Sequence, residues 1–157
     1  MKKFIAIGVA VVLVLAIYLF DFAVSRQYNF EVVTASTDVI VADGYSTTRM
    51  TVKLTKNGKP VSGHIINVVC SNGTLPQSRL VTNADGEISL RYYAYLYLDD
   101  RLTPLEDVVF HFEDESNSHI FMVPATFEYT IPAEKPESEN VWEDWQNIRA
   151  PQEGGNE

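Results

Sequence analysis

The N-terminal part of the chain is a continuous apolar segment. Two lysines are followed by seventeen uncharged and almost wholly apolar residues, 4–20, and Asp21 then interrupts a run that continues to Val24. At about 1.5 Å per residue, a helix over residues 4–24 would be about 31 Å long, close to the roughly 30 Å hydrocarbon core of a bilayer. We therefore expect residues 4–24 to cross a membrane, and the two lysines predict a cytoplasmic N-terminus.

A cleavable signal peptide is the alternative interpretation of residues 1–25. The apolar part of a signal peptide is usually about 7 to 15 residues long and ends at small residues. Ala23-Val24-Ser25 is a passable cleavage site, but the apolar run is longer than usual and aromatic residues crowd its end. A retained anchor places the protein in a cell membrane, and cleavage makes it secreted. Both interpretations place the rest of the chain outside the cytoplasm.

Residues 26–131 show the alternation of apolar and polar positions that is typical of β-strands. A clear alternation over residues 49–55 is followed by the hairpin signal Asn57-Gly58, in which both residues tolerate positive φ. Further Asn-Gly and Asp-Gly pairs divide the segment into seven to eight strands. About 100 residues with this many strands predict an all-β fold, an immunoglobulin-like antiparallel β-sandwich, preceded by one N-terminal transmembrane helix.

The strand expected near residue 90 carries a candidate contact surface. Its aliphatic face, which we assign to the core, contains Ile88, Leu90, Tyr92, Ala94, Leu96 and Leu98. Tyr93, Tyr95 and Tyr97 share the other face, and tyrosine is common in protein interfaces because it is large, rigid and amphipathic. We take these three as candidate protein-contact residues. The alternative is that they pack across neighbouring strands or under the loop 99–107.

Residues 132–157 form an acidic tail whose composition predicts that it is mostly disordered. Both tryptophans of the chain, Trp142 and Trp145, lie in it. One helical turn and a half would gather them with Ile148 on one face, so we take all three as candidate contact residues of a short helix that binds a partner's groove. The alternative is that this segment folds back on its own sandwich.

Composition and charge narrow the classes of partner. The formal net charge of −9 and the pI of about 4.7 argue against nucleic acid, because phosphate binding requires clustered basic residues. The single cysteine, Cys70, can form no intrachain disulfide, so the fold must depend on its hydrophobic core. We expect Cys70 to behave as a small buried hydrophobe.

The sequence carries no recognisable catalytic motif. It has no nucleophile elbow, no H-E-x-x-H, no P-loop and no paired-cysteine zinc pattern. We therefore predict no enzyme activity, no catalytic, cofactor-binding or metal-binding residues, no cofactor and no small-molecule substrate. Carboxylates at 99–100, 106–107 and 113–115 suggest a Ca²⁺ site as an alternative, but a solvated acidic rim is the preferred interpretation.

Four motifs in order resemble the bacterial immunoglobulin-like domain of the intimin and invasin type. They are VADGYSTT at 41–48, KNGKPVSG at 56–63, GTL at 73–75 and VTNADG at 81–86. The resemblance covers about residues 34–92, and the sequence departs from it at His64, where the family usually has Ala, and in its longer acidic loop at 99–107. It implies a noncatalytic spacer or display module at a bacterial surface, often found in tandem arrays in adhesins.

These observations predict a noncatalytic single-pass envelope protein with an extracytoplasmic C-terminal domain. We expect this domain to make protein contacts as an accessory or scaffold subunit of a bacterial envelope assembly. One alternative is a secreted or phage-encoded adhesin-like binding module, released by signal-peptide cleavage. The other is a Ca²⁺-binding or enzymatic envelope domain that uses His111 or the acidic loops.

Overall fold

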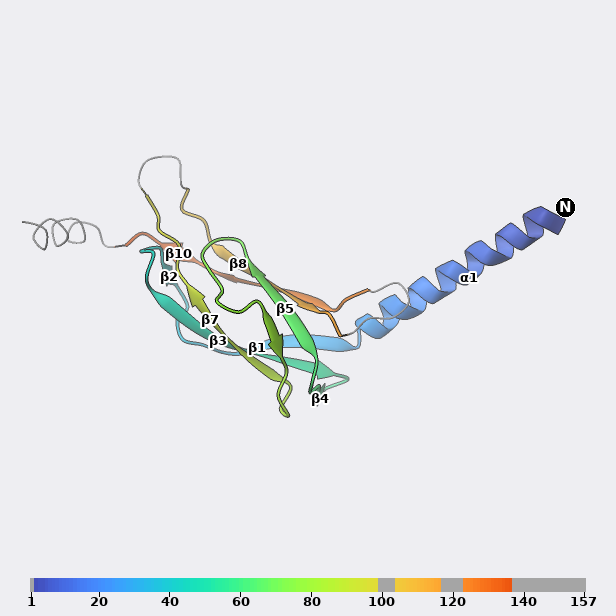
Figure 1. The fold of residues 1–157 in the computed structure, drawn as a ribbon, viewed down its shortest axis with the longest axis horizontal. Helices are drawn as coiled ribbons and strands as arrows, with labels where there is room; N and C mark the ends of the chain where they lie inside the picture. The colour runs from blue at the N-terminus through green and yellow to red at the C-terminus, as the bar shows by residue number, and fades with distance from the viewer. Residues whose placement is uncertain (1, 99–103, 117–122, 137–157) are drawn as a thin grey trace, which may run out of the picture.

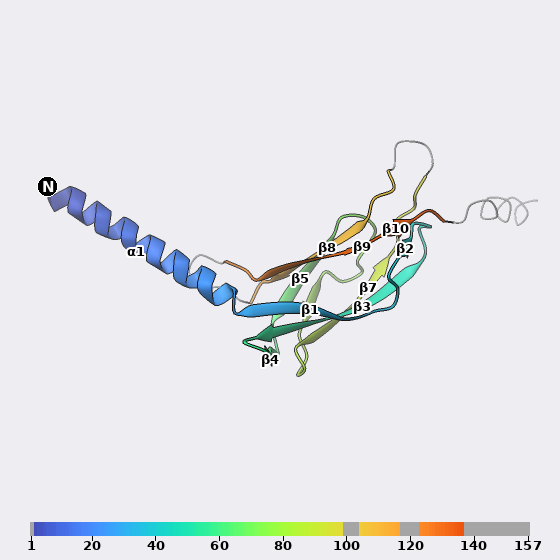
Figure 2. The same ribbon diagram turned by 180° about the vertical axis from the view of Figure 1, so that it is seen from behind.

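The computed structural model, which describes residues 2–98, 104–116 and 123–136, consists of a long helix followed by a two-layered β-domain (Figure 1). Helix α1, Lys2–Ser25, projects from one end of the domain, as Figure 2 shows from behind. Its residues Ile7–Ser25 are long and apolar enough to cross a membrane. We call the end of the domain that joins α1 the proximal end and the opposite end the distal end.

The domain is built from two antiparallel sheets. The β3 sheet contains β1 (Tyr28–Ala35), β3 (Thr47–Lys56), β4 (Lys59–Pro60) and β7 (Glu87–Tyr93). The β8 sheet contains β5 (Ile65–Cys70), β6 (Arg79–Val81), β8 (Val108–Asp114) and β9 (Thr126–Ile131) in the order β6-β5-β8-β9. A short parallel pair, β2 (Ile40–Val41) and β10 (Ala133–Glu134), lies at the distal end (Figure 1).

Strand β3 organises its sheet because it pairs with all three other strands. It is antiparallel to β1 on one edge and to β7 and β4 on the other. Met50, Val52 and Leu54 are each 1% exposed, as the alternation in the sequence predicts. Asn57 and Gly58, with φ of 51° and 76°, form the tight turn into β4, so the predicted hairpin is confirmed.

The core lies between the two sheets. Its buried members are Phe30, Ile40, Met50, Val52, Leu54, Ile66, Val68, Ile88, Leu90, Tyr92, Ala94, Val108, Phe110, Phe112, Ala125 and Ile131. Aromatic rings join the layers: Phe30 of β1 lies 6.3 Å from Phe112 of β8 and 6.0 Å from Phe127 of β9, between ring centroids. Tyr92 and Phe110 meet edge to face at 5.2 Å, a geometry that the ring quadrupoles favour.

Two core residues carry polar atoms. The Tyr92 side chain is fully buried, and among the described residues its hydroxyl has no hydrogen-bond partner. Burial, with a smaller effect of nearby Cys70, raises the pKa of Tyr92 to about 12. Cys70 is partly buried against the core, close to its expected role, and burial raises the pKa of its thiol.

Helix α1 passes into β1 almost without a connection. Only Arg26 and Gln27 lie between them, and their main-chain N–H groups donate to the carbonyls of Phe22 (3.2 Å) and Val24 (3.1 Å). The Gln27 carbonyl accepts a hydrogen bond from Asn57 N–H at 2.9 Å. The two residues between helix and strand are therefore fixed at both ends.

The structure has more strands than expected, and one expected strand ends earlier. The described residues form ten strands against the seven to eight expected, and β2, β4 and β10 are two residues long. The long strand expected through Leu98 ends instead at Tyr93, because the regular ladder with β3 ends at Thr47, opposite Tyr93. Beyond it, residues 94–97 pair only irregularly with the turn segment 42–46. The assignment of Leu96 and Leu98 to the core was therefore wrong, since they are 50% and 40% exposed.

Replacing Gly86 with Ala should strongly destabilise the domain. Gly86 has φ +75°, and a Cβ there would lie 2.5 Å from the Leu54 carbonyl oxygen and 2.9 Å from the Val61 nitrogen. Gly58 has φ +76° but open space around its Cβ position, which makes Gly58→Ala the control for backbone strain alone. We expect Gly58→Ala to cost about 1–2 kcal/mol and Gly86→Ala about 2 kcal/mol more.

Thermal unfolding of the detergent-solubilised chain, followed by circular dichroism in the β-sheet band, measures both costs. Equal losses in the two variants would contradict the close approach of backbone at Gly86.

Candidate functional site

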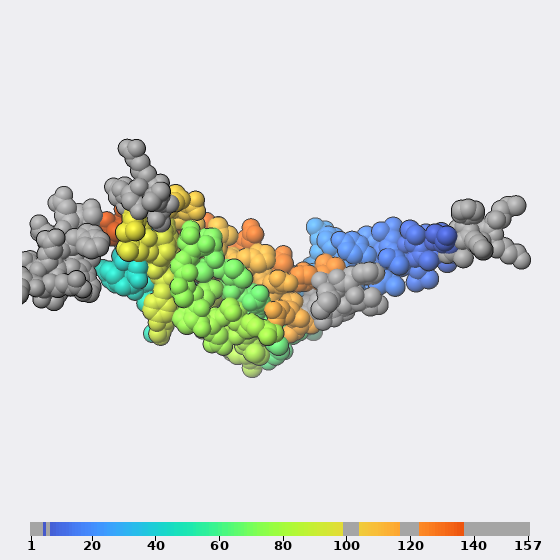
Figure 3. All heavy atoms as spheres, turned by 45° about the horizontal axis from the view of Figure 1, so that its top comes forward, coloured from blue at the N-terminus to red at the C-terminus, as the bar shows by residue number. Residues whose placement is uncertain are grey.

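Exposed apolar side chains gather at the distal end of the domain. They are Val41 (38% exposed), Tyr45 (67%), Leu96 (50%), Leu98 (40%) and Leu105 (37%), and we call them the distal surface. Figure 3 shows their segments, 41–48 in cyan and 90–98 in yellow, at the end opposite the blue helix. Outside α1, the other large apolar side chains that the structure describes as exposed are isolated valines on strands β1, β5 and β6. A grouped apolar surface of this kind is typical of a contact site.

Two chain segments build the distal surface by pairing with each other. Gly44 N–H donates to the Tyr95 carbonyl at 3.0 Å, and Tyr97 N–H donates to the Ala42 carbonyl at 2.9 Å. Gly44 has φ +81°, and a Cβ there would lie 3.1 Å from the Cβ of Leu96. The glycine therefore gives the turn its shape and leaves room for the Leu96 side chain.

Asp43 holds the turn in place. Its carboxylate accepts hydrogen bonds from the main-chain N–H groups of Tyr45 (3.0 Å) and Ser46 (2.7 Å), and also from the Ser46 hydroxyl. Partial burial alone would raise the pKa of Asp43, but these hydrogen bonds outweigh it and lower the pKa below 3.8. An ionised Asp43 is therefore part of the folded distal turn.

The three candidate tyrosines occupy alternate positions of the same segment, but their surroundings differ. Tyr93 ends β7 and exchanges two main-chain hydrogen bonds with Thr74, at 2.9 and 3.0 Å. The Tyr95 hydroxyl donates to the Glu106 carbonyl at 2.8 Å and accepts from Glu106 N–H at 3.1 Å, while its ring packs on the core. Tyr97 lies beside Lys135, whose Nζ is 5.1 Å from the ring centroid.

These surroundings give the three tyrosines different structural roles beside the distal surface. All three are partly buried. Tyr95 fastens the segment that carries Leu105, whereas Tyr93 pairs through its main chain with Thr74 and Tyr97 lies beside Lys135. A contact role for all three stays a prediction.

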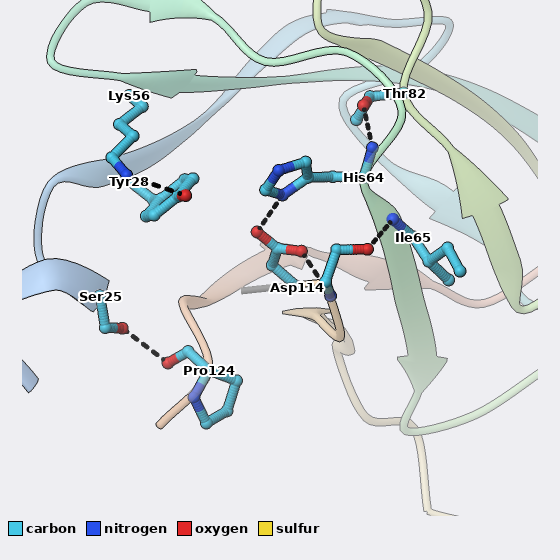
Figure 4. A network of polar contacts seen from close by, with 9 residues as sticks. Ser25, Tyr28, Lys56, His64, Ile65, Thr82, Asp114 and Pro124 are labelled. Atoms are coloured by element: carbon cyan, nitrogen blue, oxygen red, sulfur yellow. Dashed lines mark hydrogen bonds and ion pairs between the residues drawn. The ribbon is translucent and has the colours of Figure 1, made fainter. Parts of the chain in front are cut away.

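The proximal end is a polar junction between helix and sandwich (Figure 4). The Ser25 hydroxyl donates to the Pro124 carbonyl at 2.9 Å, and Ser25 is 7% exposed. Asp21, one helical turn earlier, is 1% exposed although it interrupts the apolar run in the sequence. The last turn of α1 thus belongs to the folded domain as well as to the helix.

A contact between a histidine and a buried carboxylate lies next to this junction. His64 Nδ1 is 2.7 Å from Oδ2 of Asp114, whose side chain is fully buried, while the His64 side chain is 21% exposed (Figure 4). The other carboxylate oxygen of Asp114 accepts from Ser116 N–H at 3.0 Å, and the Ser116 hydroxyl accepts from Ile65 N–H at 2.8 Å. Both oxygens of the buried Asp114 carboxylate therefore have a hydrogen-bond partner, as the burial of a polar group requires.

The described residues hold no cluster of three or more His, Cys, Asp or Glu side chains that could bind a metal ion. His111 lies at the surface of β8, 3.5 Å from the exposed Glu128, an arrangement typical of a weak surface pair. The carboxylates at 99–100, like Trp142, Trp145 and Ile148, lie outside the described residues, so the predictions for them stay predictions.

The distal surface was missed by the sequence reasoning because its members belong to separate segments. Val41 and Tyr45 flank a turn, Leu105 lies in a loop, and Leu96 lies three residues beyond the end of β7. The one available signal was the turn motif at 43–46, which marks a change of direction but not which side chains become exposed.

Comparison with solved structures finds the resemblance that the motifs suggested. The chain is similar to the D0-D1 domain of intimin (TM-score 0.45, 18% identity, 68% of this chain and 50% of that chain). It is similar to a C-terminal intimin fragment solved with the intimin-binding domain of its translocated receptor (TM-score 0.45, 23% identity, 64% and 31%). It is also similar to the Yersinia pseudotuberculosis adhesin InvE (TM-score 0.47, 20% identity, 71% and 27%).

These similarities concern the architecture of a mostly antiparallel β-domain of the intimin and invasin type. The chain spans half or less of the length of the adhesin fragments that it matches. No protein-family model and no curated protein matches it.

Replacing Tyr95 with Phe should loosen the distal loop. The variant leaves both the N–H and the carbonyl of Glu106 without the hydroxyl, so we expect a loss of about 1–2 kcal/mol in the free energy of unfolding. Tyr92→Phe is the matched control, because it removes a buried hydroxyl that has no described partner and should leave stability equal or higher. Calorimetric unfolding of both variants compares them; a larger loss for Tyr92→Phe would be contrary to this assignment.

Asp43 should make the stability of the folded domain depend on pH in the acidic range. The pKa of Asp43 is lower in the folded chain than its ordinary value of 3.8. The ionised carboxylate therefore stabilises the fold fully when the pH is above 3.8, and this stabilisation is lost as the pH falls through the lower pKa of the folded chain. Asp43→Ala should therefore cost about 1 kcal/mol at neutral pH and less in acid.

Asp43→Asn, which keeps an acceptor oxygen but no charge, is the control. It should retain most of the neutral-pH stability and lose the acid dependence. Urea unfolding at neutral pH and below pH 3.8 measures the differences, and an Asp43→Ala deficit that stayed constant with pH would contradict the role of the charge.

Proposed function

We propose that this protein is a single-pass protein of a bacterial cell envelope that presents its distal surface to another protein. The observation that carries this proposal is the polarity of the molecule. An apolar helix extends from one end of the domain, and the segments that carry the grouped apolar side chains lie at the other (Figure 1). The helix suits a lipid environment and the distal surface suits contact with a protein, and the two lie at opposite ends of the domain.

The exposure of α1 supports insertion in lipid. Apolar side chains on all sides of the helix are exposed, among them Ile5 (64%), Val12 (67%) and Phe20 (64%). A helix that is apolar all round needs an apolar environment along its length, which a bilayer supplies. Its 24 residues correspond to about 36 Å, enough to cross the hydrocarbon core with its last turn outside it.

The proximal junction supports a retained anchor over a cleaved signal peptide. The small residues 23–25 lie inside α1, and the Ser25 side chain is buried and bonded to Pro124. Cleavage at this place would remove the helical turn that packs on the sandwich, including the buried residues Asp21 and Ser25. The two lysines before the apolar run orient the anchor with its N-terminus in the cytoplasm.

The size of the domain sets where a partner must lie. The ten residues of β3 correspond to about 34 Å, and this strand runs most of the length of the domain. A single sandwich therefore carries the distal surface only a few tens of ångströms from the bilayer. We infer that the partner is a neighbouring envelope protein and that this chain is its accessory or scaffold subunit, without a reaction of its own.

Photocrosslinking in intact cells tests the contact surface. A photoreactive amino acid at Tyr45 or Leu96 should give a discrete crosslinked product with a second protein. Val69 and Val81, which are 55% and 62% exposed on the β8 sheet, are the controls and should give none. Equal products from all four positions would contradict a distal contact site.

The same cells test the anchor. The mass of the mature chain should include residues 1–25, and the chain should stay with the membrane after alkaline extraction. A mature N-terminus at or just after Ser25 would instead support a secreted module.

A further inference from the structure

Arg49 and Arg91 face each other across two strands of the β3 sheet. Arg49 of β3 and Arg91 of β7 are register partners, and both side chains are exposed. Arg49 exchanges hydrogen bonds with Ser36 on its other side, through its carbonyl and its N–H, at 2.9 Å each. The two arginines therefore form a non-hydrogen-bonded pair, the arrangement that brings opposite side chains closest.

Such a pair is unfavourable unless an acidic group compensates it. Like charges directly opposite each other destabilise a sheet. Lys53 on the same strand shows the usual solution, because its two register partners are Glu31 and Glu87. Arg49 and Arg91 have no such neighbour, and neither makes an ion pair with any residue that the structure describes.

Arg91, one member of the arginine pair, borders a groove along the edge of β7 that faces away from β3. This groove, of about 250 Å³, is lined by Arg91 and Tyr93 on one side and by Pro76, Gln77 and Leu80 on the other. Tyr93 directs its main-chain N–H and carbonyl away from β3, towards Thr74, and strand alternation directs those of Arg91 to the same edge. The groups of Tyr93 are bonded to Thr74, so a segment lying here would meet the guanidinium and main-chain groups of Arg91 and an apolar wall of Pro76 and Leu80.

The chain itself carries an acidic segment that begins at the same end of the domain. Residues 137–157 contain six acidic residues and one basic residue, and the adjacent acidic pair is Glu143-Asp144. The tail leaves the domain after Lys135, which lies beside Tyr97. Tyr97 is six residues, at most about 21 Å, from Arg91, and seven extended residues from Pro136 to Glu143 cover about 24 Å.

We propose that the C-terminal tail docks on its own domain, with Glu143 and Asp144 against the guanidinium groups of Arg49 and Arg91. Each guanidinium offers a planar fork of donors that suits a carboxylate. Docking neutralises the like-charge pair and brings Trp142 and Trp145 beside the groove that Tyr93 lines. This contact is separate from the distal surface and from the anchor, so it stands or fails independently of the proposed function.

Tryptophan fluorescence reports this docking directly, because both tryptophans of the chain flank the acidic pair. The experiment uses the full chain, one copy per nanodisc of uncharged lipid, and measures quenching by acrylamide. In the unaltered protein we expect protected tryptophans with blue-shifted emission. Raising the salt to about 1 M, where the Debye length is about 3 Å, should increase the quenching.

Charge reversal identifies the site. In Arg49→Glu/Arg91→Glu, the ratio of docked to free tail should fall about tenfold, because several charge-assisted contacts are lost together. Lys56→Glu/Lys59→Glu is the matched control: Lys56 and Lys59 are also register partners on the β3 sheet, but at its proximal end. This control makes the same change in net charge and should leave the quenching unchanged.

A charge swap provides the decisive variant. Adding Glu143→Lys/Asp144→Lys to the arginine reversal should restore protection, while the tail reversal alone should abolish it. Circular dichroism checks that every variant keeps its β-sheet signal, and the rescued protein tests the contact even where a single reversal lowers stability. Fully accessible tryptophans in the unaltered chain, insensitivity to both reversals, or protection that depends on two copies sharing a nanodisc would each overturn the proposal.

Discussion

The stability of the whole domain depends on the packing of the β3 sheet against the β8 sheet. With one cysteine and no possible intrachain disulfide, the chain must offset the entropy of folding by burying apolar surface alone. Strand β3 supplies Met50, Val52 and Leu54 to this core and pairs with every other strand of its sheet. The distal turn, the tyrosine segment and the proximal junction all begin where β3 and its partners end. They are therefore positioned by the core although they are not part of it.

The fold could be predicted as far as local periodicity determines it. The long apolar run predicted α1, the period of two predicted the β-domain, and Asn57-Gly58 predicted a turn with two positive φ angles. Each of these signals lies within a few neighbouring residues. The same reasoning extended one strand to Leu98, because periodicity along a segment contains no information about where its partner strand stops.

The site could not be predicted in the same way, because it depends on contacts between distant residues. His64 and Asp114 are 50 residues apart and Ser25 and Pro124 are 99 apart, yet each pair is in direct contact. Tyr95 was selected from the sequence as a surface residue, but its hydroxyl binds the main chain of Glu106. The Arg49–Arg91 pair likewise becomes visible only when the register of β3 and β7 is known.

The connection through Arg26 and Gln27 has a mechanical consequence. These two residues are hydrogen-bonded to the helix on one side and to the Asn57 turn on the other, so nothing between α1 and β1 acts as a swivel. The tilt of the helix in the bilayer therefore sets the angle between the domain and the membrane. Rotation of the helix about its axis rotates the distal end of the domain by the same angle. Lipid thickness, by changing that tilt, would steer the tip towards or away from a neighbour without any rearrangement inside the sandwich.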